Sequence, residues 1–245
     1  MMDANQSKKH PMSVIEAIYT RRSCRHFKAG EKIPEWKMEM ILDAARYAPS
    51  PENMQFWRFI RIRDEDTKKW LADVAQEQAQ LVFGSVPYEL AADRLWYLPP
   101  DQRPAVVQNV ADGSLFRYPE DASDVVLVCT SEGGVDYLSP YPFTNFMQLV
   151  SAALAIQNMW LTATALGVGV GWNNLPSIDQ RREQTLKERF GIPEGVSVVT
   201  TLCFGVPRTD RILGPSRFPL EGIAFEEYWG NPYRRISLRS QNEEE

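Results

Sequence analysis

The 245-residue sequence has little of what most metal and hydrolytic sites are built from. It contains three cysteines, Cys24, Cys129 and Cys203, and two histidines, His10 and His26. Three scattered cysteines are too few for a disulfide framework or a zinc knuckle. Two histidines exclude a His-rich metal site and argue against a catalytic triad built on histidine. The GxxxxGK[ST], HExxH and GxSxG motifs are also missing, so we expect no metal site and assign no catalytic side chain.

A surplus of positive charge is missing as well. The formal net charge is −5, and 44% hydrophobic with 24% charged residues is an ordinary globular mixture. This balance argues against a nucleic-acid partner and excludes a disordered or low-complexity chain. The first 12 residues are polar and have no apolar core, so they are not a signal peptide, and we expect residues 1–12 to be disordered. The expected location is cytoplasmic.

One long stretch, residues 137–178, has no charged residue. Residues 146–171 within it are long enough to cross a bilayer, which leaves a membrane-associated protein as an alternative. Polar side chains such as Gln148 and Gln157 interrupt the stretch, and three glycines break its last third. A buried helix that runs into a buried strand fits this pattern better, and we expect no membrane partner.

Positive charge is concentrated near the start of the chain. The first 63 residues carry 12 Lys and Arg against 7 Asp and Glu, whereas the remaining residues carry 15 against 25. Arg21, Arg22, Arg25 and Lys28 form a cluster with no acidic residue among them. A tight cationic cluster in an acidic protein indicates a bound anion, with a solvated basic turn as the alternative.

Hydrophobic periodicity and capping signals predict helices and strands that alternate loosely, as in an α+β or α/β domain. The predicted helices run from Ser13 to the arginine cluster, from Pro34 until Pro49 stops the helix, and over about 66–81, 145–166 and 177–191. The predicted strands run over 56–63, 125–129, 168–172 and 196–204. Ser177-x-x-Gln180 is interpreted as a capping box. The stretch 86–121, with five prolines, is expected to be irregular and to act as a lid or binding segment.

The sequence offers polar residues but no recognisable catalytic acid, base or nucleophile, a pattern typical of an enzyme whose reactive centre is a bound cofactor. Several motifs then occur in a characteristic order. They are RRSCRHF (21–27), APSPENMQFW (48–57), AIQNMWL (155–161) followed by GVG (167–169), FGIPEG (190–195), LCFGVP (202–207) and RFPL (217–220). Together they resemble the FMN-dependent nitroreductase superfamily over about residues 14–223. Phe56 and Pro215 depart from the family pattern, which has proline and often lysine there.

The resemblance implies FMN as cofactor, with NADH or NADPH as the reductant. It assigns the phosphate and ribityl end to Arg21, Arg22, Ser23 and Arg217, and the N1/O2 edge of the flavin to Arg25. Guanidinium groups suit both places, because they match phosphate geometry and stabilise negative charge on a reduced flavin.

Two further segments are assigned to the flavin by the same resemblance. The implied contacts of the isoalloxazine and ribityl chain, supplied by the partner subunit, are Pro49, Ser50, Asn53 and Gln55. The loop beside the ring is implied to carry Gly171, Trp172 and Asn173.

The fold implied is an α+β nitroreductase-like sandwich in an intertwined homodimer. Its mostly antiparallel, four-stranded sheet would be flanked by helices and extended by a strand from the partner's tail. The implied organisation is an FMN domain over 13–224, with a lid over about 86–143, and an arm over 225–245 that contacts the partner subunit.

The implied activity is ping-pong hydride transfer from NAD(P)H, through flavin N5, to a small aromatic or conjugated acceptor such as a nitroaromatic, a quinone or an activated alkene. Reductive dehalogenation, flavin cleavage and a flavin-binding sensor or storage protein remain alternatives.

Overall fold

A computed structural model describes residues 12–131, 144–209 and 214–233. Apart from Met12, the segment predicted to be disordered lies outside these residues, as do 132–143 of the predicted lid and 234–245 of the predicted arm. The sheet has four strands: β1 (Trp57–Ile62), β2 (Asp124–Ser131), β3 (Gly169–Asn173) and β4 (Val196–Gly205). Their order is β1-β2-β4-β3, and all neighbouring pairs are antiparallel. The predicted antiparallel sheet is confirmed.

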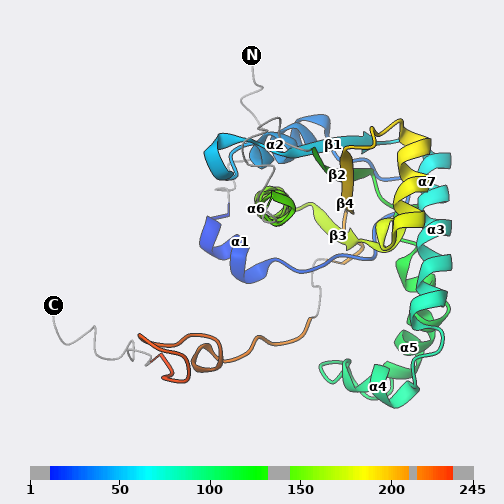
Figure 1. Ribbon diagram of the computed structural model, residues 1–245. Coiled ribbons are helices and arrows are strands. Elements are labelled where there is room, and N and C mark those ends of the chain that lie inside the picture. Colours follow the sequence, from blue (N-terminus) through cyan, green and yellow to red (C-terminus); the bar gives the residue numbers. More distant parts are fainter. Residues whose placement is uncertain (1–11, 132–143, 210–213, 234–245) are drawn as a thin grey trace, which may run out of the picture.

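Helices cover both faces of this sheet (Figure 1). They are α1 (Val14–Thr20), α2 (Glu35–Ala45), α3 (Glu65–Phe83), α4 (Tyr88–Asp93), α5 (Arg103–Ala111), α6 (Thr144–Ala165) and α7 (Gln180–Phe190). Figure 1 shows α6 between α1 and α2 on one side of the sheet, with α3 and α7 on the other. Helices of this kind on an antiparallel sheet make the chain an α+β domain, as predicted.

The central strand β2 shows how the two faces are filled. Val126 and Val128 pack in a core with α2 and α6. Val125, Leu127 and Cys129 alternate with them and pack in a second core with α3 and α7. Because successive side chains of a strand point to opposite faces, one continuous apolar run serves both cores.

Helix caps confirm one predicted start and correct another. Ser13 caps α1, where its hydroxyl accepts a 3.1 Å hydrogen bond from the Glu16 amide. The predicted capping box at Ser177 is wrong, because Ser177 ends a short 3₁₀ turn and Asp179 caps α7. The Asp179 carboxylate accepts hydrogen bonds from the Arg182 amide and from the Gln78 side chain, at 2.9 and 2.8 Å. A charged acceptor with a second partner makes the stronger cap.

The expectation of an irregular stretch over 86–121 is wrong in part. This stretch contains α4 and α5, which continue from the end of α3 away from the sheet (Figure 1). Pro87 precedes the first turn of α4, and Pro104 lies in the first turn of α5. Proline is tolerated there because the first helical amides have no partner within the helix. These two prolines therefore mark helix starts, whereas the other three prolines of the stretch lie outside the helices.

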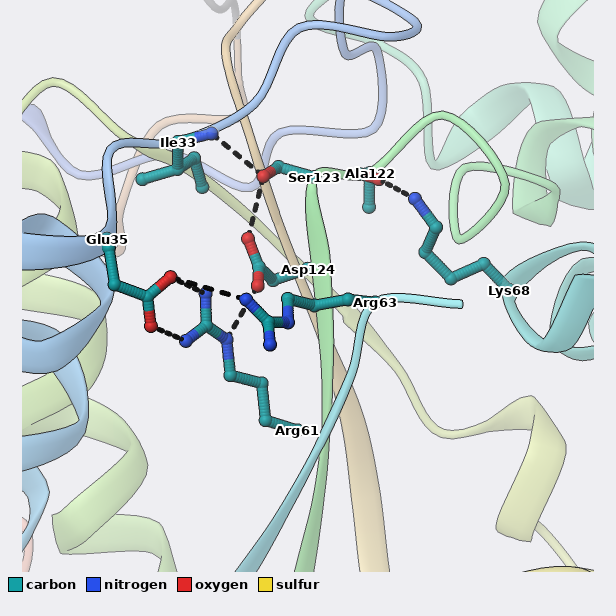
Figure 2. Close-up of polar contacts among 8 residues, drawn as sticks. All are labelled: Ile33, Glu35, Arg61, Arg63, Lys68, Ala122, Ser123 and Asp124. Atoms are coloured by element: carbon teal, nitrogen blue, oxygen red, sulfur yellow. Dashed lines mark hydrogen bonds and ion pairs between the residues drawn. The ribbon is translucent and has the colours of Figure 1, made fainter. Parts of the chain in front are cut away.

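A polar network joins the start of α2 to the sheet (Figure 2). Arg61 on β1 pairs with both carboxylate oxygens of Glu35 and, at 2.7 Å, with Oδ1 of Asp124 on β2. The Ser123 hydroxyl donates to Asp124 Oδ2 at 2.7 Å and accepts from the Ile33 amide at 2.8 Å. Asp124 is buried, and every charge in this network has a partner of opposite sign or a hydrogen bond.

From Thr144 onward the uncharged stretch forms α6 and β3, so the predicted helix and strand are present. β3 is largely buried, but α6 is buried on one side only, because Phe146, Leu149 and Leu154 are exposed. Within the described residues, no helix combines the length and apolar character needed to span a membrane. At the other end of the chain, residues 214–233 extend away from the helices and the sheet (Figure 1).

Candidate functional site

The segment that carries the RRSCRHF motif lies along the edge of the sheet formed by β3. Ser23 forms a parallel bridge with Val170, and the Cys24 amide donates to the Val170 carbonyl at 2.8 Å. A Cβ at Gly171 would lie only 2.5 Å from the Cys24 carbonyl oxygen and 2.7 Å from the Tyr118 ring. Glycine is required at this position, because no side chain fits between β3 and these two neighbours.

Three arginines meet at one side of this segment. Burial lowers the pKa of Arg21, and the positive charges of Arg217 and Arg22 lower it further. The chain reaches Arg217 after passing Gly214, where a Cβ would lie 3.2 Å from Arg22 Cδ. None of the three guanidinium groups has a carboxylate partner among the described residues. Cations held together without a counter-charge form a site suited to an anion.

A tryptophan pair continues the site inward from Arg21. The Arg21 guanidinium carbon lies 4.7 Å from the centre of the Trp160 ring, and Trp160 stacks on Trp172 at 6.4 Å and 24°. Trp160 Nε1 is buried and has no hydrogen-bond partner among the described residues. A buried N–H donor without an acceptor is costly, so it marks a place where a ligand oxygen or nitrogen would fit. Trp160 was not among the predicted site residues; its orphaned N–H could not be read from the motif.

Arg25 lies beside a buried tyrosine that reaches β3. The Tyr118 hydroxyl donates a 2.5 Å hydrogen bond to the Trp172 carbonyl. Burial raises the pKa of Tyr118 well above its usual value, and the nearby Arg25 guanidinium opposes that rise. The phenol therefore stays protonated and holds the Trp172 backbone in place. Sequence reasoning missed Tyr118, which belongs to no recognised motif.

Asn173 is the last residue of β3, and its side chain forms hydrogen bonds within the fold. It is buried, and its Nδ2 donates to the Phe116 carbonyl at 3.0 Å. Its Oδ1 accepts a hydrogen bond from the Leu175 amide at 3.3 Å. Both ends of the side-chain amide are therefore engaged, whereas Trp172 is 37% exposed and remains available at the surface.

The turn with the other predicted contacts has an unusual backbone. Glu52, Asn53 and Gln55 have φ values of 50°, 57° and 50°, in the left-handed region. The Ser50 hydroxyl accepts from the Gln55 amide at 3.0 Å, and Gln55 Nε2 donates to Asn53 Oδ1 at 3.2 Å. Pro49 at its start is exposed. Strained backbone of this kind is concentrated at ligand sites.

This turn and the arginine segment are not brought together within one chain. Figure 1 shows α1, which leads into Arg21, and α2, which leads into Pro49, on opposite sides of α6. The side-chain hydrogen bonds of Ser50 and Gln55 stay within the turn. That the turn serves a partner subunit stays a prediction.

The described residues provide no site for a metal ion, but they do enclose a cavity for a small molecule. Among the described residues, no group of three His, Cys, Asp or Glu side chains could hold a metal ion. A cavity of about 900 Å³ opens beside Ser23 and Arg25, between them and the helices α3, α4 and α5.

Comparison with known proteins decides the family. The sequence profile of the nitroreductase family matches residues 18–206. The chain belongs to the nitroreductase family. This membership agrees with the resemblance found in the motifs, which lie in the same order along the matched region.

Several known proteins are similar to this chain over most of their length. A 5,6-dimethylbenzimidazole synthase of Rhodospirillum rubrum is 28% identical over 197 residues, 80% of this chain and 83% of its own. An NADPH-flavin oxidoreductase of Vibrio harveyi is 25% identical over 231 residues, 92% of this chain and 77% of its own. The crystal structure of a BluB-like flavoprotein of Clostridium difficile matches with a TM-score of 0.63 and 26% identity, over 88% of this chain and 99% of that one.

Proposed function

We propose that this member of the nitroreductase family is an FMN-dependent oxidoreductase that takes electrons from NADH or NADPH and reduces a small aromatic or conjugated molecule. The observation that carries the proposal is the cluster of Arg21, Arg22 and Arg217 beside the N–H of Trp160. Within the described ranges, the three arginines have no carboxylate partner and the N–H has no acceptor. A phosphate-bearing aromatic cofactor would supply both the missing negative charge and an acceptor. The names of relatives as flavin proteins point the same way.

Different residues would bind different parts of the FMN molecule. Arg21, Arg22 and Arg217 would hold the phosphate, and Ser23 the ribityl chain beside it. Arg25 would place a positive charge at the N1/O2 edge, where it stabilises negative charge without reorganisation. When bound, the flavin would supply the two-electron chemistry, as hydride acceptor from NAD(P)H and donor to the substrate.

The strand β3 supplies the other wall of the site. Gly171 lets the backbone approach closely, and Tyr118 fixes the Trp172 carbonyl, so the main chain of Trp172 and Asn173 would pass beside the ring. No side chain acts as a proton donor in this proposal. Solvent can deliver protons to the reduced substrate.

A homodimer would complete the site. The side of α6 that faces away from the sheet carries large exposed apolar residues, such as Phe146 at 64% and Leu149 at 49%. Soluble proteins rarely expose a contiguous apolar face of this kind unless a partner covers it. In the dimer, the turn with Pro49, Ser50, Asn53 and Gln55 would reach the partner's arginine cluster, and the arm 225–245 would lie on the other subunit. We place this dimer in the cytoplasm.

The relative named for dimethylbenzimidazole synthesis favours one second candidate, oxygen-dependent cleavage of the flavin itself. The dimethylbenzene ring of 5,6-dimethylbenzimidazole is also part of the flavin ring system. Cleavage would destroy the cofactor, whereas oxidoreduction would return it unchanged.

A visible absorption spectrum of the purified protein, followed by anaerobic addition of NADH or NADPH, tests both candidates. The proposal predicts a flavin spectrum that NAD(P)H bleaches and that a nitroaromatic or quinone restores. Bleaching that is irreversible after admission of oxygen supports flavin cleavage. Bound flavin that neither nucleotide bleaches supports a sensor or storage protein, and failure to bind added FMN contradicts the proposal.

A further inference from the structure

The cavity beside Ser23 and Arg25 has the size of a small-molecule site. Its volume of about 900 Å³ lies in the range of ligand pockets. Apolar side chains of α3 and α5 and the segment between α3 and α4 form much of its wall; they include Val82, Phe83, Val86, Val107 and Val110. Val82 is 42% exposed, so the cavity is open to solvent at this side. It would accept an apolar or aromatic body.

The charges at this cavity have a single sign. Arg25 and Arg94 both line it, and none of its described lining residues is Asp or Glu. Glu89 and Asp93, the acidic residues of α4, are exposed and are not part of the lining. Neither lining arginine forms an ion pair within the described part of the chain. An apolar wall with two unpaired cations is complementary to an apolar anion.

The same wall includes residues assigned to the flavin. Ser23 and Arg25 line the cavity and are also predicted cofactor contacts. A molecule in the cavity would therefore lie next to the bound cofactor. His26 lines the cavity as well, and burial together with Arg208 and Arg25 lowers its pKa, so it adds a neutral polar edge.

We propose that this cavity binds the oxidising substrate, and that this substrate is an apolar or aromatic molecule carrying one carboxylate or similar anionic group. Its assignment as the oxidising substrate rests on the proposed function. Its chemical class rests on the apolar wall of the cavity and on Arg94, because Arg25 is assigned to the flavin.

Calorimetric titration of the full-length protein, with and without added FMN, tests the chemical class. The probes are 2-naphthoate and 2-naphthamide, which share ring and shape but differ by one charge. We expect naphthoate to bind about tenfold more tightly than the amide, as one charge-assisted contact allows. Arg94→Gln should remove most of that preference, while Lys69→Gln, which removes an exposed charge away from the cavity, should preserve it.

Variants that fill the cavity test whether the probes bind there. Ala91→Phe introduces a ring into the lining of α4 and should weaken both probes at least about tenfold, because a filled cavity has no room for a naphthalene ring. Val110→Phe on α5 provides a second variant if the first does not fold, as judged by circular dichroism. Equal affinity for the two probes, or a preference that survives Arg94→Gln, overturns the anionic class. If the probes still bind to a folded variant with a filled cavity, the cavity is not their binding site.

Kinetics separate this inference from the proposed function. The acceptors for this test are 4-nitrobenzoate and 4-nitrobenzamide. Arg94→Gln should raise the KM for 4-nitrobenzoate but not for 4-nitrobenzamide, and kcat for both should stay nearly unchanged. If the charge-dependent binding is present but the protein takes up no flavin, the proposed function fails and the site for an apolar anion stands. If flavin turnover is present without charge-dependent binding, the inference fails and the proposed function stands.

Discussion

Two arginine clusters of this protein have opposite surroundings. Arg61 lies between Glu35 and Asp124, and its three N–H contacts to carboxylates lock α2 onto the sheet (Figure 2). Arg21 lies among other arginines, and burial together with the charges of Arg217 and Arg22 lowers its pKa. The first cluster satisfies itself and therefore stabilises the fold. In the second, unsatisfied cluster the arginines repel one another, and a bound anion would reduce this repulsion. Unpaired charges of this kind are typical of a binding site, whereas a structural ion pair already contains both signs.

The largest effect should come from breaking the satisfied cluster. Asp124→Ala leaves the partly buried Arg61 without its inner partner, and we expect it to lower the free energy of unfolding by about 3–5 kcal/mol. Urea denaturation measures this loss. Asp93→Ala, which removes an exposed carboxylate, should have little effect. A loss of similar size in both variants would contradict the structural role of the network.

Breaking the unsatisfied cluster should affect the ligand and not the fold. Arg21→Met should raise the dissociation constant of FMN roughly 30-fold, because a charge-assisted contact to phosphate is lost. Its free energy of unfolding should stay the same or rise, since repulsion from Arg22 and Arg217 is reduced. Flavin fluorescence measures binding, and riboflavin, which has no phosphate, should respond far less.

Lys28→Met provides the matched control for Arg21→Met. Lys28 carries the same charge but pairs with Glu31 at 3.6 Å, so its loss should leave FMN affinity nearly unchanged. Equal losses of FMN and riboflavin affinity in Arg21→Met would place Arg21 away from the phosphate.

A smaller effect is expected from the aromatic support of Arg21. Trp160→Leu removes the ring under the guanidinium group and should weaken FMN binding about fivefold, in keeping with a cation–π contact. Trp160→Phe should restore part of the affinity, because it retains an aromatic face. The ratio of FMN to riboflavin affinity is the deciding readout, since a general packing defect would weaken both ligands alike.

The smallest effect is expected from Glu35, the exposed carboxylate of the Arg61 cluster, and it concerns the pH dependence of stability. Hydrogen bonding to Arg61 lowers the pKa of Glu35 from its usual value of 4.5. The folded state therefore favours the ionised carboxylate, and the stability this contributes is present above about pH 4.5 and is lost as the pH falls through the lowered pKa. Thermal unfolding below this pH should be less steeply pH-dependent in Glu35→Gln. An unchanged slope would show that Glu35 contributes little to acid unfolding.

The same contrast explains what could be foreseen from the sequence. The arginine motif was recognised because its members are neighbours in the chain and lack acidic residues between them. Nothing local links Glu35, Arg61 and Asp124, which belong to three different elements. Tyr118 and Trp160 were missed as site residues for the same reason, since their partners Trp172 and Arg21 are distant in sequence.

By itself, the sequence determined the sheet strands, the main helices and the motif that marks the family, because these depend on local periodicity and on neighbouring residues. Only the tertiary structure decided that Arg217 lies near Arg21 and that α4 and α5 form a cavity beside Arg25. It also decided that Trp160 Nε1 has no hydrogen-bond partner in the described part of the chain. Proline is compatible both with a loop and with the first turn of a helix, so the prolines of 86–121 did not reveal α4 and α5 in advance. Burial and the approach of distant charges arise from packing, which no local pattern encodes.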